Sequence, residues 1–189
     1  MDETQNLHSG KRKARPKLEL KTEQQTYDYA LNLLSFRDHS QKEMKQKLTR
    51  KGASPEQAQS SIDKLTDYGI MNEERFAQRV YEAWLAKRIY GRQHLAAELV
   101  KKGVPKEYCQ QILEQFTDEM ELERAEQAAR QYCKLNRIKI SKVLASNDNK
   151  ERQRLYAAAC RYLIARGFGS STMEIMLNCM RRLTLQEID

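Results

Sequence analysis

The sequence is poor in the residues that interrupt helices, with three prolines and seven glycines among 189 residues. This scarcity disfavours a turn-rich β fold. No apolar run approaches the length that spans a bilayer, and residues 1–17 show no apolar stretch after their charges, as a secretory signal requires. We therefore expect a helical protein of the cytoplasm, without a membrane partner.

Metal ligands are also scarce. No histidine stands at ligand spacing from the four cysteines, which lie at positions 109, 133, 160 and 179 and form no Cys-x-x-Cys pair. A structural zinc site needs clustered ligands, so we predict neither a metal nor another cofactor. The cysteines are interpreted as small buried side chains on apolar helix faces and not as ligands or disulfide partners.

The common signatures of catalysis are missing as well. The sequence contains no glycine-rich phosphate loop, no Gly-x-Ser-x-Gly elbow and no His-Glu-x-x-His motif. Its carboxylates are scattered along solvated faces, without the pairing in a pocket that acid–base catalysis uses. We predict that the protein is not an enzyme and acts by binding.

Residues 71–116, by contrast, show clear helical patterns. Phe76, Val80 and Trp84 recur at the helical spacing, which predicts a helix over residues 73–89 with the aromatic side chains of Phe76 and Trp84 in the core. Leu95 and Leu99 mark a second helix, which ends before Gly103. A third helix follows a proline at position 105. Helices this short are stable only when packed into one unit.

This unit of three helices is repeated. Gly52 and Gly103 are 51 residues apart, and the same offset superposes Met44 on Leu95 and Leu48 on Leu99. A third copy matches at an offset of 64, which requires 13 added residues. Repeats with an insertion in one copy indicate an array.

We therefore predict an all-α protein, an elongated tandem array of three three-helix repeats. Residues 1–21 are predicted to be a flexible basic tail, residues 22–70 the first repeat and residues 71–117 the second. Residues 118–189 form the third, with a polar insertion near 138–150. The basic tail is interpreted as a solvated terminus, and an electrostatic arm for an acidic partner is the alternative.

Basic residues gather on or beside the second predicted helix of each repeat, within a chain of formal net charge +8. A lysine or arginine before glycine recurs in all three repeats and is interpreted as a helix cap. Arg75 is open to two readings, partner binding or pairing with a nearby carboxylate. The candidate partner-binding residues on the basic face are Lys42, Lys45, Arg50, Arg75, Arg88, Arg92, Lys101, Arg152 and Arg161.

Three-helix units also occur in helix-turn-helix domains, whose last helix enters the major groove. Here the predicted third helix of the first repeat carries Glu56, Asp63 and Asp67 against one lysine. Phosphates repel such a surface, so site-specific DNA recognition is disfavoured. Weak, nonspecific contact of a helical repeat protein with nucleic acid is the alternative function.

The motifs at these spacings resemble those of the RecX family, regulators of the bacterial recombinase RecA. The resemblance is carried by Glu74-Arg75-Phe76-Ala77 followed by Gly91 and Lys102-Gly103, and by residues 29–34 and 48–52 of the first repeat. It implies binding to the RecA filament, mainly with inhibition of recombinase, ATPase and coprotease activities in DNA repair and the SOS response. We expect the protein to be a monomer.

Overall fold

The computed structural model describes residues 19–87 and 89–185, and every regular element within these ranges is a helix. This confirms the predicted all-α class. Residues 1–18, most of the predicted tail, lie outside the described residues, as does Arg88. The helices are α1 (Glu23–Phe36), α2 (Gln41–Arg50), α3 (Pro55–Asp67), α4 (Glu73–Leu85), α5 (Arg92–Lys102), α6 (Lys106–Gln115), α7 (Asp118–Leu135), α8 (Arg137–Ala145), α9 (Asn149–Ile164), the short 3-10 helix η1 (Ser170–Thr172) and α10 (Met173–Leu185).

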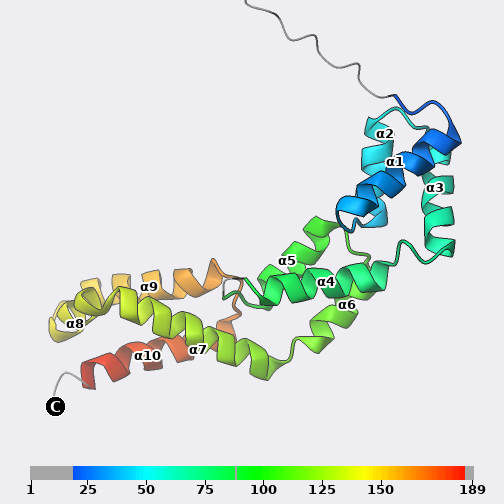
Figure 1. Cartoon of the computed structure of the whole chain (residues 1–189). Coiled ribbons are helices and arrows are strands. Elements are labelled where there is room, and N and C mark those ends of the chain that lie inside the picture. The colour runs from blue at the N-terminus through cyan, green and yellow to red at the C-terminus, as the bar shows by residue number, and fades with distance from the viewer. Residues whose placement is uncertain (1–18, 88, 186–189) are drawn as a thin grey trace, which may run out of the picture.

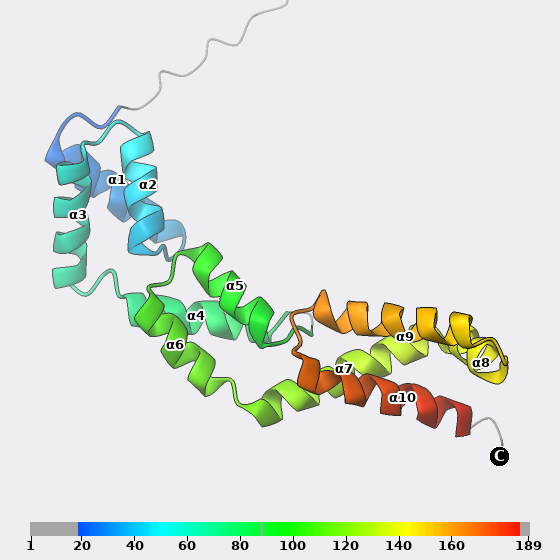
Figure 2. The same cartoon turned by 180° about the vertical axis from the view of Figure 1, so that it is seen from behind.

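The helices form three units, each with its own hydrophobic cluster. Helices α1–α3 make the first unit, α4–α6 the second and α7–α10 the third, and helices pack mainly within a unit. The units follow one another along a bent, elongated molecule with the first and third units at opposite ends (Figure 1; Figure 2). The predicted elongated helical array is confirmed, and the three clusters are consistent with three repeats.

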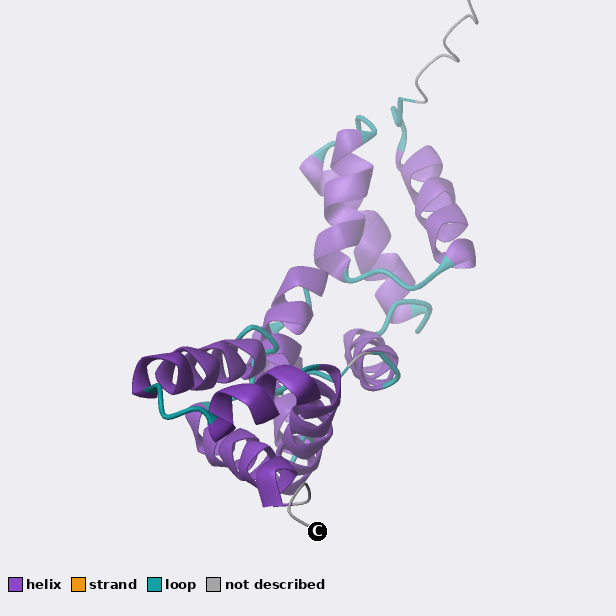
Figure 3. Cartoon of the chain, turned by 90° about the vertical axis from the view of Figure 1, so that its left-hand side faces the viewer, coloured by secondary structure: helices purple, strands orange, loops and turns teal. Residues whose placement is uncertain are grey.

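The third unit contains one α-helix more than each of the other two, and the 3-10 helix η1. Its helices surround a common core, visible end-on in the part of the molecule nearest the viewer in Figure 3. The insertion predicted as polar is largely the helix α8, whose Ile140 and Val143 are 0% and 7% exposed. Only residues 146–148 are a polar connection outside the helices. The insertion therefore enlarges the core of the third unit.

The cysteines lie on the apolar sides of their helices, as interpreted from the sequence. Cys109 and Cys133 are buried, and Cys160 and Cys179 are half-buried. Burial, together with a hydrogen bond to Cys179, raises the pKa of Cys133 to about 12, so this thiol stays protonated at neutral pH. The described residues contain no group of three His, Cys, Asp or Glu side chains that could hold a metal ion.

Helix starts follow the capping residues in the sequence. Ser54 and Gln57 form a reciprocal capping box at α3, with Pro55 in the first turn. Ser40 caps α2 by accepting a hydrogen bond from the backbone N–H of Glu43. The reciprocal half of that box is not made, because the Glu43 carboxylate turns to Arg37 instead.

The predicted tail ends too late in the sequence. Leu20 is 2% exposed and belongs to the core of the first unit. Its backbone N–H donates to the carbonyl of Lys51 at 2.8 Å, beside Gly52. The core of the first unit thus includes a residue before the predicted boundary, because a single leucine without helical periodicity can still fill a core position.

The helix predicted over residues 73–89 ends earlier, at Leu85. Beyond it, Ile89 packs against the core of the third unit and not the second. The Gly91 N–H donates to the carbonyl of Arg166 at 2.9 Å, and the Gln93 N–H donates to that of Gly167 at 3.0 Å. These backbone contacts with the third unit override the local helical pattern.

The junction between the second and third units is closely packed. A Cβ atom at Gly91 would lie 2.6 Å from the carbonyl oxygen of Gly167 and 2.7 Å from the ring of Phe168. A Cβ at Gly167 would lie 2.3 Å from the backbone nitrogen of His94. Two glycines thus allow the two backbones to meet directly.

Candidate functional site: a basic surface between α2 and α5

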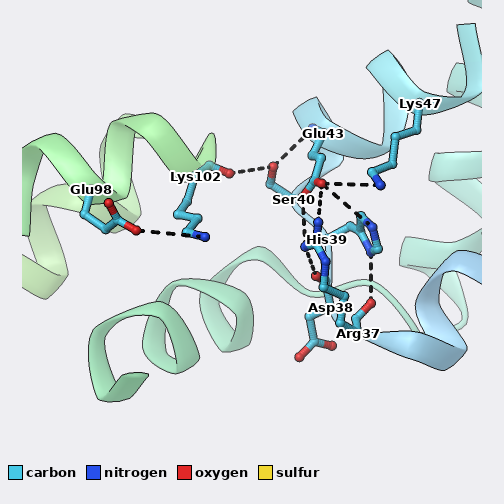
Figure 4. Close-up of polar contacts among 8 residues, drawn as sticks. All are labelled: Arg37, Asp38, His39, Ser40, Glu43, Lys47, Glu98 and Lys102. Atoms are coloured by element: carbon cyan, nitrogen blue, oxygen red, sulfur yellow. Dashed lines mark hydrogen bonds and ion pairs between the residues drawn. The ribbon is translucent and has the colours of Figure 1, made fainter. Parts of the chain in front are cut away.

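The start of α2 lies against the end of α5. The Ser40 hydroxyl, which caps α2, donates to the carbonyl of Lys102 at 3.0 Å (Figure 4). The backbone N–H of Gln41 donates to the Glu73 carboxylate at 2.6 Å, which ties α2 to the first turn of α4. An ion pair between Arg79 and Asp38 adds a further link. The first two units are therefore joined mainly by polar side chains.

Glycine at the end of α5 makes this approach possible. Gly103 has a φ of 78°, in the left-handed region, and closes the helix as the sequence predicted. A Cβ atom there would lie 2.8 Å from the Ser40 hydroxyl and 3.3 Å from the Cβ of Lys42. The pair Lys102-Gly103 thus ends α5, and it is also the point at which the start of α2 packs against the second unit.

The junction carries a hollow of about 380 Å³ with basic side chains around it. Lys42 from α2 and Lys101 from α5, both predicted as binding residues, meet here. The hollow is lined by Arg37, Ser40, Lys42, Glu43, Gln46, Lys101, Lys102 and Gly103. The structure therefore brings together basic residues that are 59 positions apart in the sequence.

The carboxylates at this surface are already paired. Glu43 accepts from Arg37 at 3.0 Å and lies 3.7 Å from Lys47 (Figure 4). Glu98 lies 3.9 Å from Lys102. Among the described residues no ion pair forms at Lys42 or Lys101, and both side chains are exposed. Their two charges are consequently available to an acidic partner.

Other predicted residues lie elsewhere on the molecule. Lys45 reaches towards α3, where it donates to Gln59 at 3.0 Å, and Arg50 is exposed at the far end of α2. Arg75 is exposed on α4 and donates to the carbonyl of Ile70 at 3.0 Å. Arg161 is exposed on α9, in the third unit. The candidates that the structure describes thus do not form one continuous face.

Arg92 is not a freely exposed basic residue, so that part of the sequence interpretation is wrong. Its guanidinium contacts Glu121 at 3.2 Å and Asp118 at 2.7 Å, and donates to the carbonyl of Leu113 at 2.9 Å. It also lies 5.5 Å from the ring centre of Phe116. These contacts join α5 to α6 and α7, and helical periodicity within α5 could not reveal them.

Arg152 is likewise used inside the fold. The half-buried guanidinium donates to the carbonyl of Leu144 at 2.9 Å, near the end of α8. The sequence placed this residue on a basic face because the neighbouring charges are basic. The sequence did not identify Arg37 and Lys102 as residues that line the hollow. The one available signal was the capping serine at position 40, which marks the start of α2 close to Arg37.

Two titratable side chains, the buried His39 and the half-buried Glu73, lie beside the hollow. His39 is 5% exposed, and burial lowers its pKa despite the opposing influence of the Arg37 carbonyl and Glu43. Burial raises the pKa of Glu73, which is only partly offset by the hydrogen bond from Gln41. One polar atom of each, His39 Nε2 and Glu73 Oε2, lacks a hydrogen-bond partner within the described residues. At the first junction, burial thus lowers the pKa of the histidine and raises that of the carboxyl.

We predict that protonation of His39 destabilises the fold. The unfolded chain binds this proton near the ordinary histidine pKa of about 6.5, whereas the folded chain binds it only at lower pH. The unfolded state thus holds more protons in this window, and stability falls as the pH drops. The raised pKa of Glu73 has the opposite effect on the pH dependence of stability. The test therefore compares two proteins that both carry Glu73→Gln, one with His39 and one with His39→Gln.

Urea unfolding should show that His39→Gln loses less stability than the histidine-containing protein between about pH 7.5 and 5.5. Parallel stability curves for the two proteins over this range would contradict the prediction.

The fold and its surface define an elongated helical array with polar, largely basic contact sites. A sequence model of the first three-helix domain of RecX matches residues 27–65. The regulatory protein RecX of Pelodictyon phaeoclathratiforme is 31% identical over 134 residues, which cover 69% of this chain and 84% of that protein. The regulatory protein RecX of Listeria welshimeri is 30% identical over 115 residues, which cover 61% of this chain and 43% of that protein.

The fold is shared as well. The crystal structure of RecX from Lactobacillus salivarius has a TM-score of 0.66 at 20% sequence identity, and the alignment covers 86% of this chain and 97% of that one. The chain therefore belongs to the RecX family of regulatory proteins. No helix in the part of the chain that the structure describes is long and apolar enough to cross a membrane.

Proposed function

We propose that the protein binds the filament of the recombinase RecA and mainly inhibits its recombinase, ATPase and coprotease activities, in DNA repair and the SOS response. The observation that carries this proposal is membership of a family of regulatory proteins. Its action is binding and not catalysis, and the working compartment is the cytoplasm.

The shape of the molecule supports a polymeric partner. Successive units of an array contact mainly their neighbours and leave long surfaces on their flanks. A bent chain of three units can follow the surface of a helical polymer and contact more than one of its subunits. The hollow between α2 and α5 supplies positive charge, which attracts an acidic surface and accelerates encounter.

The partner is tested by co-sedimentation with RecA filaments at near-physiological salt, with naked single-stranded DNA as control. A second candidate function, nonspecific nucleic-acid binding, is favoured by the net charge of +8. Binding that rests on phosphate contacts weakens steeply, by about 10³–10⁵ between about 50 and 200 mM salt when 6–10 phosphates are neutralised. Preferential retention by the filament, with a shallower salt dependence, supports the proposed function. Equal retention with equal slopes supports the second candidate.

We predict that Lys42→Glu combined with Lys101→Glu weakens filament binding about 10-fold or more, since the attraction of these two charges becomes repulsion. Both side chains are exposed, so helical circular dichroism and stability should change little. Inhibition of the DNA-dependent ATPase of RecA gives the readout.

The matched control is Lys106→Glu with Arg154→Glu, which changes the net charge equally on exposed side chains of α6 and α9. Full inhibition by the folded Lys42 and Lys101 variant would exclude this hollow as the working surface. Arg75 and the third unit would then be the next surfaces to test.

A further inference from the structure

The two ends of the molecule carry surfaces of opposite charge. At one end lies the outer face of α3, in the first unit. At the other lies the corner where α7 meets α8, in the third unit (Figure 1). Neither surface is used in the contacts between units described above.

The α3 face is acidic and has an open depression of about 580 Å³ along it. Glu56, Asp63 and Asp67 are exposed there. Lys64 is the one basic residue lining the depression, and its charge is offset by Glu23 at 2.8 Å. Lys45, from α2, reaches only the edge of this face, at Gln59.

Apolar side chains adjoin the acidic face. Tyr68 and Ile70, which directly follow α3, are 72% and 38% exposed. The α3 end therefore offers carboxylates next to accessible apolar surface, a combination that suits a basic partner with apolar side chains of its own.

The α7–α8 corner has the complementary composition. Residues 127–147 contain five basic residues and no acidic one. Leu135 and Ile138, at the corner itself, are 74% and 86% exposed. Lys139 and Lys142 are exposed on α8 beside them. Exposed large apolar side chains rimmed by charges occur at interaction surfaces.

We propose that these two ends bind each other in different copies of the chain, so that molecules associate head to tail. The occupant of the acidic α3 face is the α7–α8 corner of a second copy, because that corner supplies lysines for the carboxylates and Leu135 and Ile138 for the apolar edge. A contact between two different patches is heterologous. It produces an open chain of molecules unless the rotation between successive copies closes a ring. The contact is electrostatic in large part and therefore sensitive to salt.

Sedimentation velocity of the full-length protein tests the contact in the absence of RecA and DNA. The sedimentation coefficient should rise with protein concentration at low salt and stop rising at high salt. Lys139→Glu with Lys142→Glu replaces the two exposed lysines beside Leu135 and Ile138 by carboxylates, and Asp63→Lys with Asp67→Lys makes the α3 face basic. Each double variant alone should lose the concentration dependence, since the substituted side chains then face side chains of the same charge across the contact.

An equimolar mixture of the two double variants should regain association, because each end again meets an opposite charge. The chain that carries all four substitutions should regain it for the same reason. Lys42→Glu with Lys101→Glu is the matched control and should associate like the unchanged protein. Circular dichroism verifies that every variant is folded.

Three results would overturn the proposal: a wild-type protein that stays monomeric at every concentration at low salt, double variants that still associate, or a mixture that does not regain association. Retention of single-stranded DNA that depends on Lys139 and Lys142, without self-association, would assign the corner to nucleic acid instead. Because the assay contains no RecA, its outcome is independent of the proposed function.

Discussion

Leu99→Ala is expected to lower the free energy of unfolding by about 2–5 kcal/mol, as substitutions that remove a buried leucine side chain do. Leu99 is 0% exposed, in the core of the second unit formed by α4, α5 and α6. Truncation removes packed methyl groups and leaves a cavity among rigid neighbours, including Trp84. Chemical denaturation followed by circular dichroism measures the loss.

The adjacent residue provides a control on the same helix. Val100 is 66% exposed, so Val100→Ala changes little buried surface and should alter stability by less than about 0.5 kcal/mol. An unfolding curve for Leu99→Ala that coincides with that of Val100→Ala would contradict the assignment of Leu99 to the core.

Gly91→Ala is expected to disrupt the junction between the second and third units. The new methyl group would lie 2.6 Å from the carbonyl oxygen of Gly167, a backbone atom that cannot rotate away. Overpacking of this kind costs typically about 1–3 kcal/mol. Because the strain is relieved by moving the two units apart, small-angle scattering should show an altered radius of gyration as well as reduced stability.

Gly169→Ala separates this effect from the general cost of replacing a glycine. Gly169 has an ordinary φ of −75°, and the nearest atom to its Cβ position is the Ser171 hydroxyl at 3.7 Å. This variant should keep the shape and stability of the parent protein. A Gly91→Ala protein with an unchanged scattering profile would show that the junction adapts without separating.

Positions that face a local core could be predicted from the sequence. Spacing along one helix identified Leu95 and Leu99, and the 51-residue offset linked them to Met44 and Leu48; all four are 0% exposed. Periodicity succeeds here because each unit buries the side chains of its own short helices, so the pattern needs only nearby residues.

Contacts between units could not be predicted in this way. Arg92 was counted among the basic-face candidates because it lies at the start of the second predicted helix of its repeat, but its carboxylate partners belong to α7, in the next unit. The early end of α4 and the meeting of Gly91 with Gly167 depend on a turn 75 residues further along the chain. A lysine such as Lys101 was identified correctly as exposed, but its place beside Lys42 required the packing of α2 against α5.

The hydrogen bond from Gly91 to Arg166 also has a consequence for synthesis of the chain. The partner of Gly91 is made 75 residues later. Ribosomes add about 5–20 residues per second, so this gap corresponds to roughly 4–15 s. During that time the first unit has all of its own residues and can fold, whereas the start of α5 lacks its backbone partner. The start of α5 therefore reaches its final structure only when the third unit is made, although the ribosome completes the second unit first.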